Sequence, residues 1–86
     1  MSPFDRLLLA VSHLSDSIVR VYFIDELLTR HDRNMTYLQA SWCLNRFMSR
    51  TTLSITDRNK MQDECDKILD LHAAEAKQVE TDAHQP

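Results

Sequence analysis

The side chains best suited to chemistry in this sequence are its histidines, its two cysteines and a few carboxylates. His72 follows Cys65 by seven residues and precedes Glu75 by three. A zinc ion needs three or four converging ligands, and seven residues along a helix separate two side chains by about 10 Å. The spacing therefore predicts no metal site and no other cofactor, and we interpret His72 as part of the apolar stripe of a helix.

Cys43 is the other candidate for chemistry, as a nucleophile. A nucleophilic thiol or hydroxyl needs a base beside it and an oxyanion hole. No histidine stands at helical spacing from Cys43, and the chain contains no glycine for the tight turn that usually exposes a nucleophile. Cys43 and Cys65 are therefore interpreted as small core residues. The sequence predicts no catalytic residue and no enzyme.

Asp25 stands out because it falls on a helical line where the apolar pattern calls for another apolar side chain. One interpretation is that the apolar line ends at Tyr22 and Asp25 faces solvent. The other is that Asp25 makes a polar contact that fixes the register, either with a basic residue of a partner or with Arg46 or Arg50. The sequence leaves both interpretations open.

The composition favours an all-α fold. The 86 residues suffice for one small domain, and 43% of them are hydrophobic. There is no glycine, and the two prolines stand at positions 3 and 86. Without glycine, tight hairpins, phosphate-binding loops and dinucleotide-binding turns lack the residue that readily adopts positive φ. P-loop enzymes, Rossmann enzymes and hairpin-rich β folds are thus disfavoured.

The first predicted helix covers residues 3–31. Ser2 caps it, Pro3 suits its first turn, and Asp5 places a negative charge near free N–H groups. No strong helix breaker follows until the end of this range. The polar segment 12–17 is the weakest part of the helix and could bend it.

Two further helices are predicted. Thr36 and Gln39 form a candidate capping box for a helix over residues 37–49. A short connector rich in β-branched residues follows, and a third helix covers residues 57–79.

These elements predict a small three-helix bundle with a long N-terminal helix, able to pair with a second copy. Residues 1–80 form a single helical domain, and residues 81–86 form a disordered C-terminal tail. An alternative architecture is open. If the first helix kinks near Ser15 and folds back, the chain becomes a compact four-helix monomer.

Apolar residues lie on more than one face of the first predicted helix. At 100° per residue, one line forms a bundle-like seam that comprises Phe4, Leu7, Val11, Leu14, Ile18, Val21 and Tyr22. The far side carries Leu9, Val19, Phe23, Ile24 and Leu27. The second helix also has two apolar sides, with Leu38 and Trp42 opposite its main stripe. A large apolar side chain left in water forgoes about 1.5–3 kcal/mol.

This surplus of apolar surface predicts a binding surface for another protein, for a second copy of the chain, or for both. The predicted contact residues are Val19, Phe23, Leu27, Leu38 and Trp42. Trp42 is the strongest candidate, because a lone tryptophan opposite the main stripe is either a second core contact or an interface anchor. In the kinked four-helix alternative, the chain covers both faces by itself.

Charge, apolar segments and cysteine content limit the kinds of partner and the cellular location that we expect. The net charge is −3, and residues 57–86 hold eight acids against four bases. No basic stripe exists, so nucleic acid is not an expected partner. No stretch approaches the roughly 18–20 apolar residues of a membrane span, and the N-terminus does not read as a signal peptide. With only two cysteines, a reducing, cytoplasmic location is expected.

The function predicted from these features is that of a non-catalytic interaction module, such as a small adaptor, chaperone-like or regulatory protein. An alternative comes from residues 35–54, "MTYLQASWCLNRFMSRTTLS". This stretch resembles the start of the helix-turn-helix unit of MarR-type regulators, which implies a transcription regulator that binds DNA. The basic recognition helix and the glycine-bearing wing of that family do not follow in this sequence.

Overall fold

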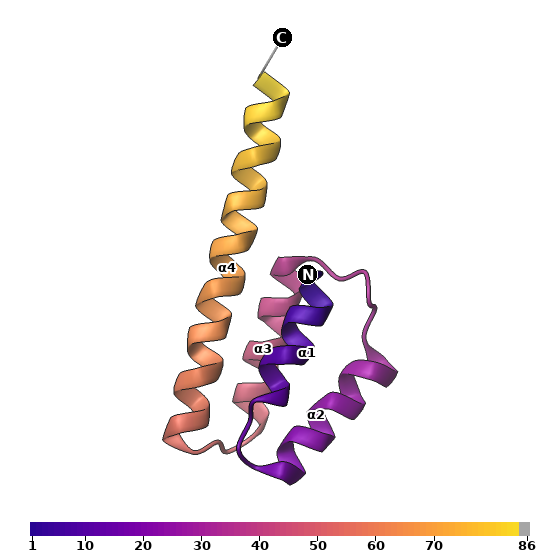
Figure 1. Cartoon of the computed structure of the whole chain (residues 1–86), viewed down its shortest axis with the longest axis vertical. Coiled ribbons are helices and arrows are strands. Elements are labelled where there is room, and N and C mark those ends of the chain that lie inside the picture. The colour runs from indigo at the N-terminus through magenta and orange to yellow at the C-terminus, as the bar shows by residue number, and fades with distance from the viewer. Residues whose placement is uncertain (85–86) are drawn as a thin grey trace.

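The computed structural model describes the backbone of residues 1–84 and the side chains of residues 1–78. This part of the chain is all-helical and contains no strand, which confirms the predicted fold class. The helices are α1 (Pro3–Ser12), α2 (Ser17–Arg30), α3 (Tyr37–Arg50) and α4 (Ile55–His84). Figure 1 shows α1 and α3 beside the first half of α4, with α2 on the side away from α4, and the second half of α4 projecting beyond all three helices.

The prediction of one long N-terminal helix in a three-helix bundle is wrong, because the chain breaks after Ser12 and forms four helices. The Asp16 side chain accepts hydrogen bonds from the N–H groups of Ile18 and Val19, at 3.0 and 3.1 Å, and so caps a new helix. The Ser12 hydroxyl donates to the Leu9 carbonyl at 2.6 Å at the end of α1. The polar residues of this segment therefore end one helix and start another.

Asp57, in the first turn of α4, fixes the α1–α2 link in place. Its carboxylate accepts the Ser15 N–H at 3.1 and 3.2 Å and the Ser15 hydroxyl at 2.7 Å. Asp57 is only 1% exposed. The hydrogen bond from the Ser15 hydroxyl is the largest influence on this carboxyl and holds its pKa below the ordinary value, although burial acts in the opposite direction.

The break also changes which face of the second segment is buried. On α2, Phe23 and Leu27 are in the core, whereas Ile18, Val21 and Tyr22 are exposed to solvent. A helical wheel keeps its phase only along an unbroken helix, and the four residues between α1 and α2 do not continue the 100° step. The apolar line predicted through residues 4–22 is therefore correct in α1 and wrong in α2.

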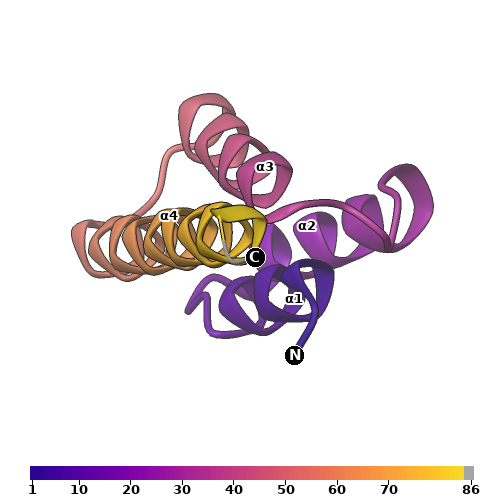
Figure 2. The ribbon, with the colours of Figure 1, turned by 90° about the horizontal axis from the view of Figure 1, so that it is seen from above.

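One hydrophobic core joins the four helices. α4 packs against α3 and α1, and α2 packs mainly on α1. Figure 2 shows α4 between α3 and α1, with α2 beyond them. The Phe23 and Phe47 rings stack with centroids 4.0 Å apart and link α2 to α3. The fully enclosed residues include Leu7, Val11, Leu14, Leu27, Leu44, Phe47, Met61, Cys65 and Ile68.

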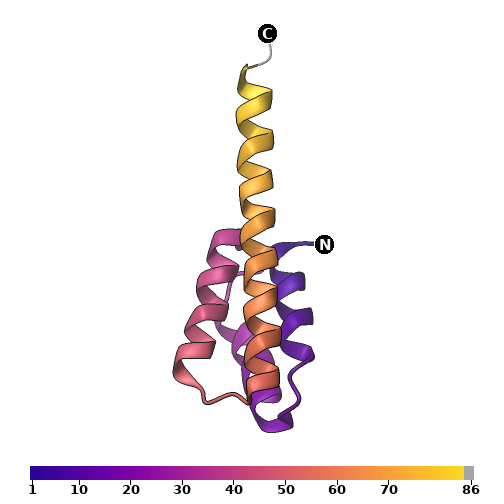
Figure 3. The same ribbon diagram turned by 90° about the vertical axis from the view of Figure 1, so that its left-hand side faces the viewer.

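The second half of α4 leaves this core. Ile68 is the last buried residue of α4 among those whose side chains are described, and residues 73–78 are all exposed. We call residues 69–84 the arm (Figure 3). The helix continues through residues 81–84, where the sequence analysis predicted a disordered tail, because neither glycine nor proline interrupts it. Residues 85–86 of that predicted tail lie outside the described residues.

Candidate functional site

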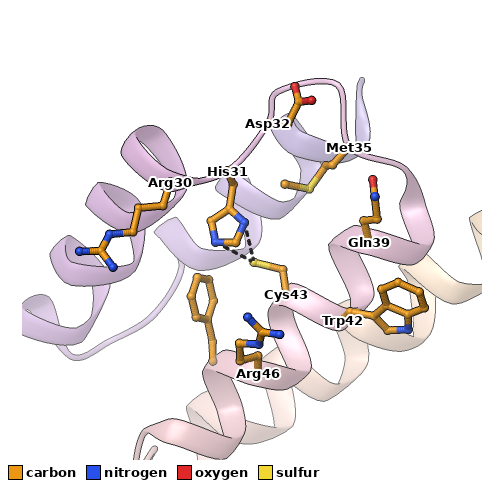
Figure 4. A pocket seen from close by; sticks show the side chains of 9 residues that line it. Arg30, His31, Asp32, Met35, Gln39, Trp42, Cys43 and Arg46 are labelled. Carbon is orange, nitrogen blue, oxygen red and sulfur yellow. Dashed lines mark hydrogen bonds between the residues drawn. The ribbon is translucent and has the colours of Figure 1, made fainter.

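The candidate site is a cleft between the end of α2 and the first three turns of α3, which we call the α2–α3 cleft. Its volume is about 270 Å³. It is lined by Arg30, His31, Asp32, Met35, Gln39, Trp42, Cys43, Arg46 and Phe47. Figure 4 shows His31 and Cys43 facing each other, with Arg30 reaching outward on the α2 side and Trp42 on the opposite side.

One local feature fixes where α3 starts, and one ion pair joins α3 to α2. The predicted capping box is present: the Gln39 N–H donates to the Thr36 hydroxyl at 3.1 Å, and the Thr36 N–H donates to the Gln39 side chain at 2.9 Å. Further along, Arg50 and Glu26 form an ion pair at 2.9 Å. Glu26 of α2 contacts Arg50 at the end of α3, whereas His31, which follows α2, contacts Cys43 in the first half of α3. The two helices therefore run antiparallel.

Trp42 is the most exposed large apolar residue of the cleft, at 61%. It stands two residues before the fully buried Leu44, and two helical steps turn the side chain by about 200°. Trp42 therefore points away from the core that Leu44 enters. The sequence places Trp42 opposite the main apolar stripe of this helix and leaves open a second core contact or an interface anchor. Gln39 and Arg46 lie within one turn of it.

The other predicted contact residues are dispersed. Leu38 is half-buried one turn before Trp42 and does not line the cleft. Val19 is half-buried in the first turn of α2 and packs against the core. The prediction that Phe23 and Leu27 contact a partner is corrected, because they are 2% and 0% exposed. They are buried because α2 is a separate helix capped by Asp16, so the face that it turns to the core is not the one extrapolated from α1.

The rim of the cleft carries positive charge. Arg30 and Arg46 are both exposed, and neither forms an ion pair within the part of the chain whose side chains are described. Arg50, further along α3, is already paired with Glu26. Asp32 is the one carboxylate among the lining residues. The cleft thus combines an exposed indole, an apolar floor and two arginines that are available to an anionic group.

His31 and Cys43 form a contact that sequence spacing did not reveal. The Cys43 sulfur lies 3.7 Å from Nε2 and 3.9 Å from Nδ1 of His31. Burial, with a smaller contribution from the Glu26 charge, raises the pKa of Cys43 to about 11. The sulfur is therefore a protonated thiol at neutral pH and a poor nucleophile. The two residues come together only through the antiparallel pairing of α2 and α3, so the sequence carried no local signal for them.

We expect Cys43 of the folded protein to resist alkylation. A rise of the thiol pKa from 9.0 to about 11 lowers the thiolate fraction by about 100-fold at pH 8. Iodoacetamide labelling followed by peptide mass spectrometry should show Cys43 reacting at least about 100-fold faster in urea than in the native protein. Rapid labelling of native Cys43 would mean that His31 activates the sulfur, and would contradict a non-catalytic cleft.

A second exposed apolar surface competes with the cleft. Ile18, Val21 and Tyr22 are 81%, 63% and 62% exposed and lie on the outer side of α2. Tyr22 also lines a hollow near the end of α3, together with Arg50. Ile18 and Val21 line none of the hollows described, so this surface offers area without a concave site.

Comparison with known proteins supplies no relative: no family model matches the chain, and no curated protein or solved structure is similar to it. Among the described residues, no group of three or more histidine, cysteine or acidic side chains is arranged to hold a metal ion. None of the helices, as far as they are described, combines the length and apolar character needed to cross a membrane.

The helix that follows the MarR-like stretch is α4. It begins at Ile55, directly after the residues that carry the resemblance, and has 30 residues. The sequence from residue 57 onward contains twice as many acids as bases. A recognition helix in a DNA groove relies on basic side chains to hold the phosphates. The transcription-regulator alternative stays a prediction, and the geometry adds no observation in its favour.

Proposed function

We propose that the protein is a non-catalytic protein–protein interaction module and that it holds its partner in the α2–α3 cleft. The observation that carries the proposal is the 61% exposure of Trp42 at the edge of a concave site. Tryptophan and arginine dominate the binding energy of protein interfaces, and here Trp42 stands beside Arg30 and Arg46. A protein partner would cover the indole and pair with both guanidinium groups.

The chemistry of the cleft indicates an acidic, amphipathic helix as the segment that binds. The floor contains Phe47 and the neutral thiol of Cys43, while the rim holds the two unpaired arginines. The first three turns of α3 line the cleft and are about 16 Å long, which matches three turns of a bound helix. Helices commonly dock by placing an apolar face into such a groove between two helices.

The sulfur chemistry supports a non-catalytic role in a reducing compartment. Cys43 and Cys65 are both free thiols and both buried. Burial is the largest cause that raises the pKa of each thiol. Unpaired, unreactive thiols suit the cytoplasm, which is the location we propose.

Affinity isolation with matched variants tests this proposal. The full-length protein, tagged and expressed in its native cells, serves as bait beside a Trp42→Ser, Arg46→Glu double variant. We expect the double variant to lose at least about 90% of the proteins that the wild type retains, because truncating a central tryptophan or arginine costs 2 kcal/mol or more. Quantitative mass spectrometry of the eluates measures the loss.

The matched control is Ile18→Ser. Ile18 is as exposed as any large apolar residue of the described chain, at 81%, and it lies on the outer side of α2. We expect this variant to retain the partners of the wild type. If Ile18→Ser loses them and the cleft variant retains them, the binding surface is the outer face of α2 and the proposed site is wrong.

A further inference from the structure

The arm and the α2–α3 cleft are two uncovered surfaces of the same chain. On the arm, Leu69, Ala73 and Ala76 follow one another at steps of four and three residues and so share one line of the helix. Leu69 is 38% exposed, and both alanines are exposed. Small residues on such a line let another backbone approach closely.

The charges on the arm complement those of the cleft. At 100° per residue, Asp70 and Glu75 flank the apolar line on opposite sides, at about 100° and 120° from it. Lys77 lies on the Asp70 side at about 80°, two turns further along the arm. Both carboxylates are exposed. In the cleft, Arg30 belongs to the α2 rim and Arg46 to the α3 rim. A helix laid in the cleft with residues 70–75 between the two rims would therefore present one acid to each rim arginine, and Lys77 would lie one to two turns beyond this contact.

The lengths and positions of the two surfaces also agree. Residues 69–84 span about 24 Å of helix, and the first three turns of α3, which line the cleft, span about 16 Å, so the arm is long enough to run the whole length of the cleft. The first turn of α3 and the loop before it lie at the end of the bundle from which the arm projects (Figure 1). The arm runs away from the cleft of its own chain. Two copies that meet head to head can each lay their arm along the cleft of the other.

We propose that the arm of a second copy is the acidic helix that occupies the α2–α3 cleft, in a reciprocal two-fold dimer. This inference rests on the proposed function, because it assigns an occupant to the same cleft. The exchange is reciprocal and closes on itself, so it yields a dimer and no open chain of molecules. We take the contact face to be one third of the helix circumference wide and the three turns of the cleft long. Over two arms and two clefts this face buries about 700 Å², an area typical of weak, transient interfaces.

Such a dimer should be reversible, with a dissociation constant in the micromolar range. Sedimentation equilibrium of the full-length protein from low micromolar to about 500 µM should show a monomer–dimer transition. Arg30→Glu with Arg46→Glu makes the cleft acidic, and Asp70→Lys with Glu75→Lys makes the arm basic. We expect each double variant alone to have a dissociation constant at least tenfold higher than wild type. In a dimer of either variant, the arm of one copy and the cleft of the other carry charge of the same sign and repel each other.

An equimolar mixture of the two double variants is the decisive sample. Each arm then meets a cleft of opposite charge, so the mixture should form a heterodimer about as tight as the wild-type dimer. A wild type that is monomeric at about 500 µM, a double variant that still dimerises like wild type, or a mixture that stays monomeric overturns the inference. If the inference is overturned while the affinity isolation still depends on Trp42, the cleft binds a different protein and the proposed function stands.

Discussion

Replacing Phe23 with alanine should lower the free energy of unfolding by about 3–5 kcal/mol, the usual cost of removing a buried phenylalanine. Phe23 is 2% exposed, and its ring stacks on Phe47 at a centroid distance of 4.0 Å. The substitution removes this stack, which joins α2 to α3, and leaves a cavity in the core. Replacing Trp42 with alanine should change the same free energy by less than about 0.5 kcal/mol, because the indole lies outside the core.

Urea denaturation followed by far-UV circular dichroism measures both variants without relying on the tryptophan signal. The pair distinguishes a core aromatic residue from a surface one within the same protein. A Phe23→Ala variant as stable as wild type would show that α2 is not packed as described. A Trp42→Ala variant destabilised as strongly as Phe23→Ala would place Trp42 in the core and remove the anchor of the proposed site.

Replacing Asp57 with alanine should cost about 1.5–3 kcal/mol, the range for a hydrogen-bonded charged group. The substitution removes the acceptor for both the N–H and the hydroxyl of Ser15, which hold the α1–α2 link against α4. The control is Asp63→Ala, because Asp63 is an exposed acid of the same helix. That variant should stay within about 0.5 kcal/mol of wild type.

The contribution of Asp57 should also depend on pH. Its pKa in the folded protein lies below the ordinary value of 3.8, so the ionised form favours the folded state. The stabilisation is complete above the unfolded pKa and is lost as the pH falls through the lower, folded value. The stability difference between wild type and Asp57→Ala should therefore be constant near neutral pH and shrink below about pH 4. A difference that grows on acidification would contradict this assignment.

Local signals in the sequence were sufficient for several parts of the structure. The capping box of Thr36 and Gln39 is present, and the all-helical character follows from the absence of glycine and of internal proline. The position of Trp42 opposite the main stripe was also predicted, because α3 is one unbroken helix and the wheel keeps its phase over 14 residues. Whether that side faced a second core contact or an interface was left open. A helix cap, and the direction of a side chain within one helix, depend on residues that are close in the sequence. Both can therefore be predicted from a single sequence.

Features that depend on tertiary contacts were not predictable in this way. The break before Asp16 could be suspected from its polar residues, but a continuous helix and a kinked one fit the same composition. The partner of Ser15 is Asp57, 42 residues away, and the contact of Cys43 with His31 arises from the antiparallel pairing of two helices. Phe23 was assigned to the wrong face because the phase of α2 is set at Asp16 and does not continue from α1.

Covalent trapping at position 42 in living cells tests the central claim most directly. An aromatic photo-crosslinking amino acid in place of Trp42, which keeps a large apolar ring at this position, should form a covalent adduct with a protein, either a second copy of this chain or a different partner. The same amino acid in place of Gln62, on the exposed side of α4, should not. An adduct from position 42 alone is the result that we predict. Adducts from position 62 alone, or from neither position, would contradict a protein-binding role for the α2–α3 cleft.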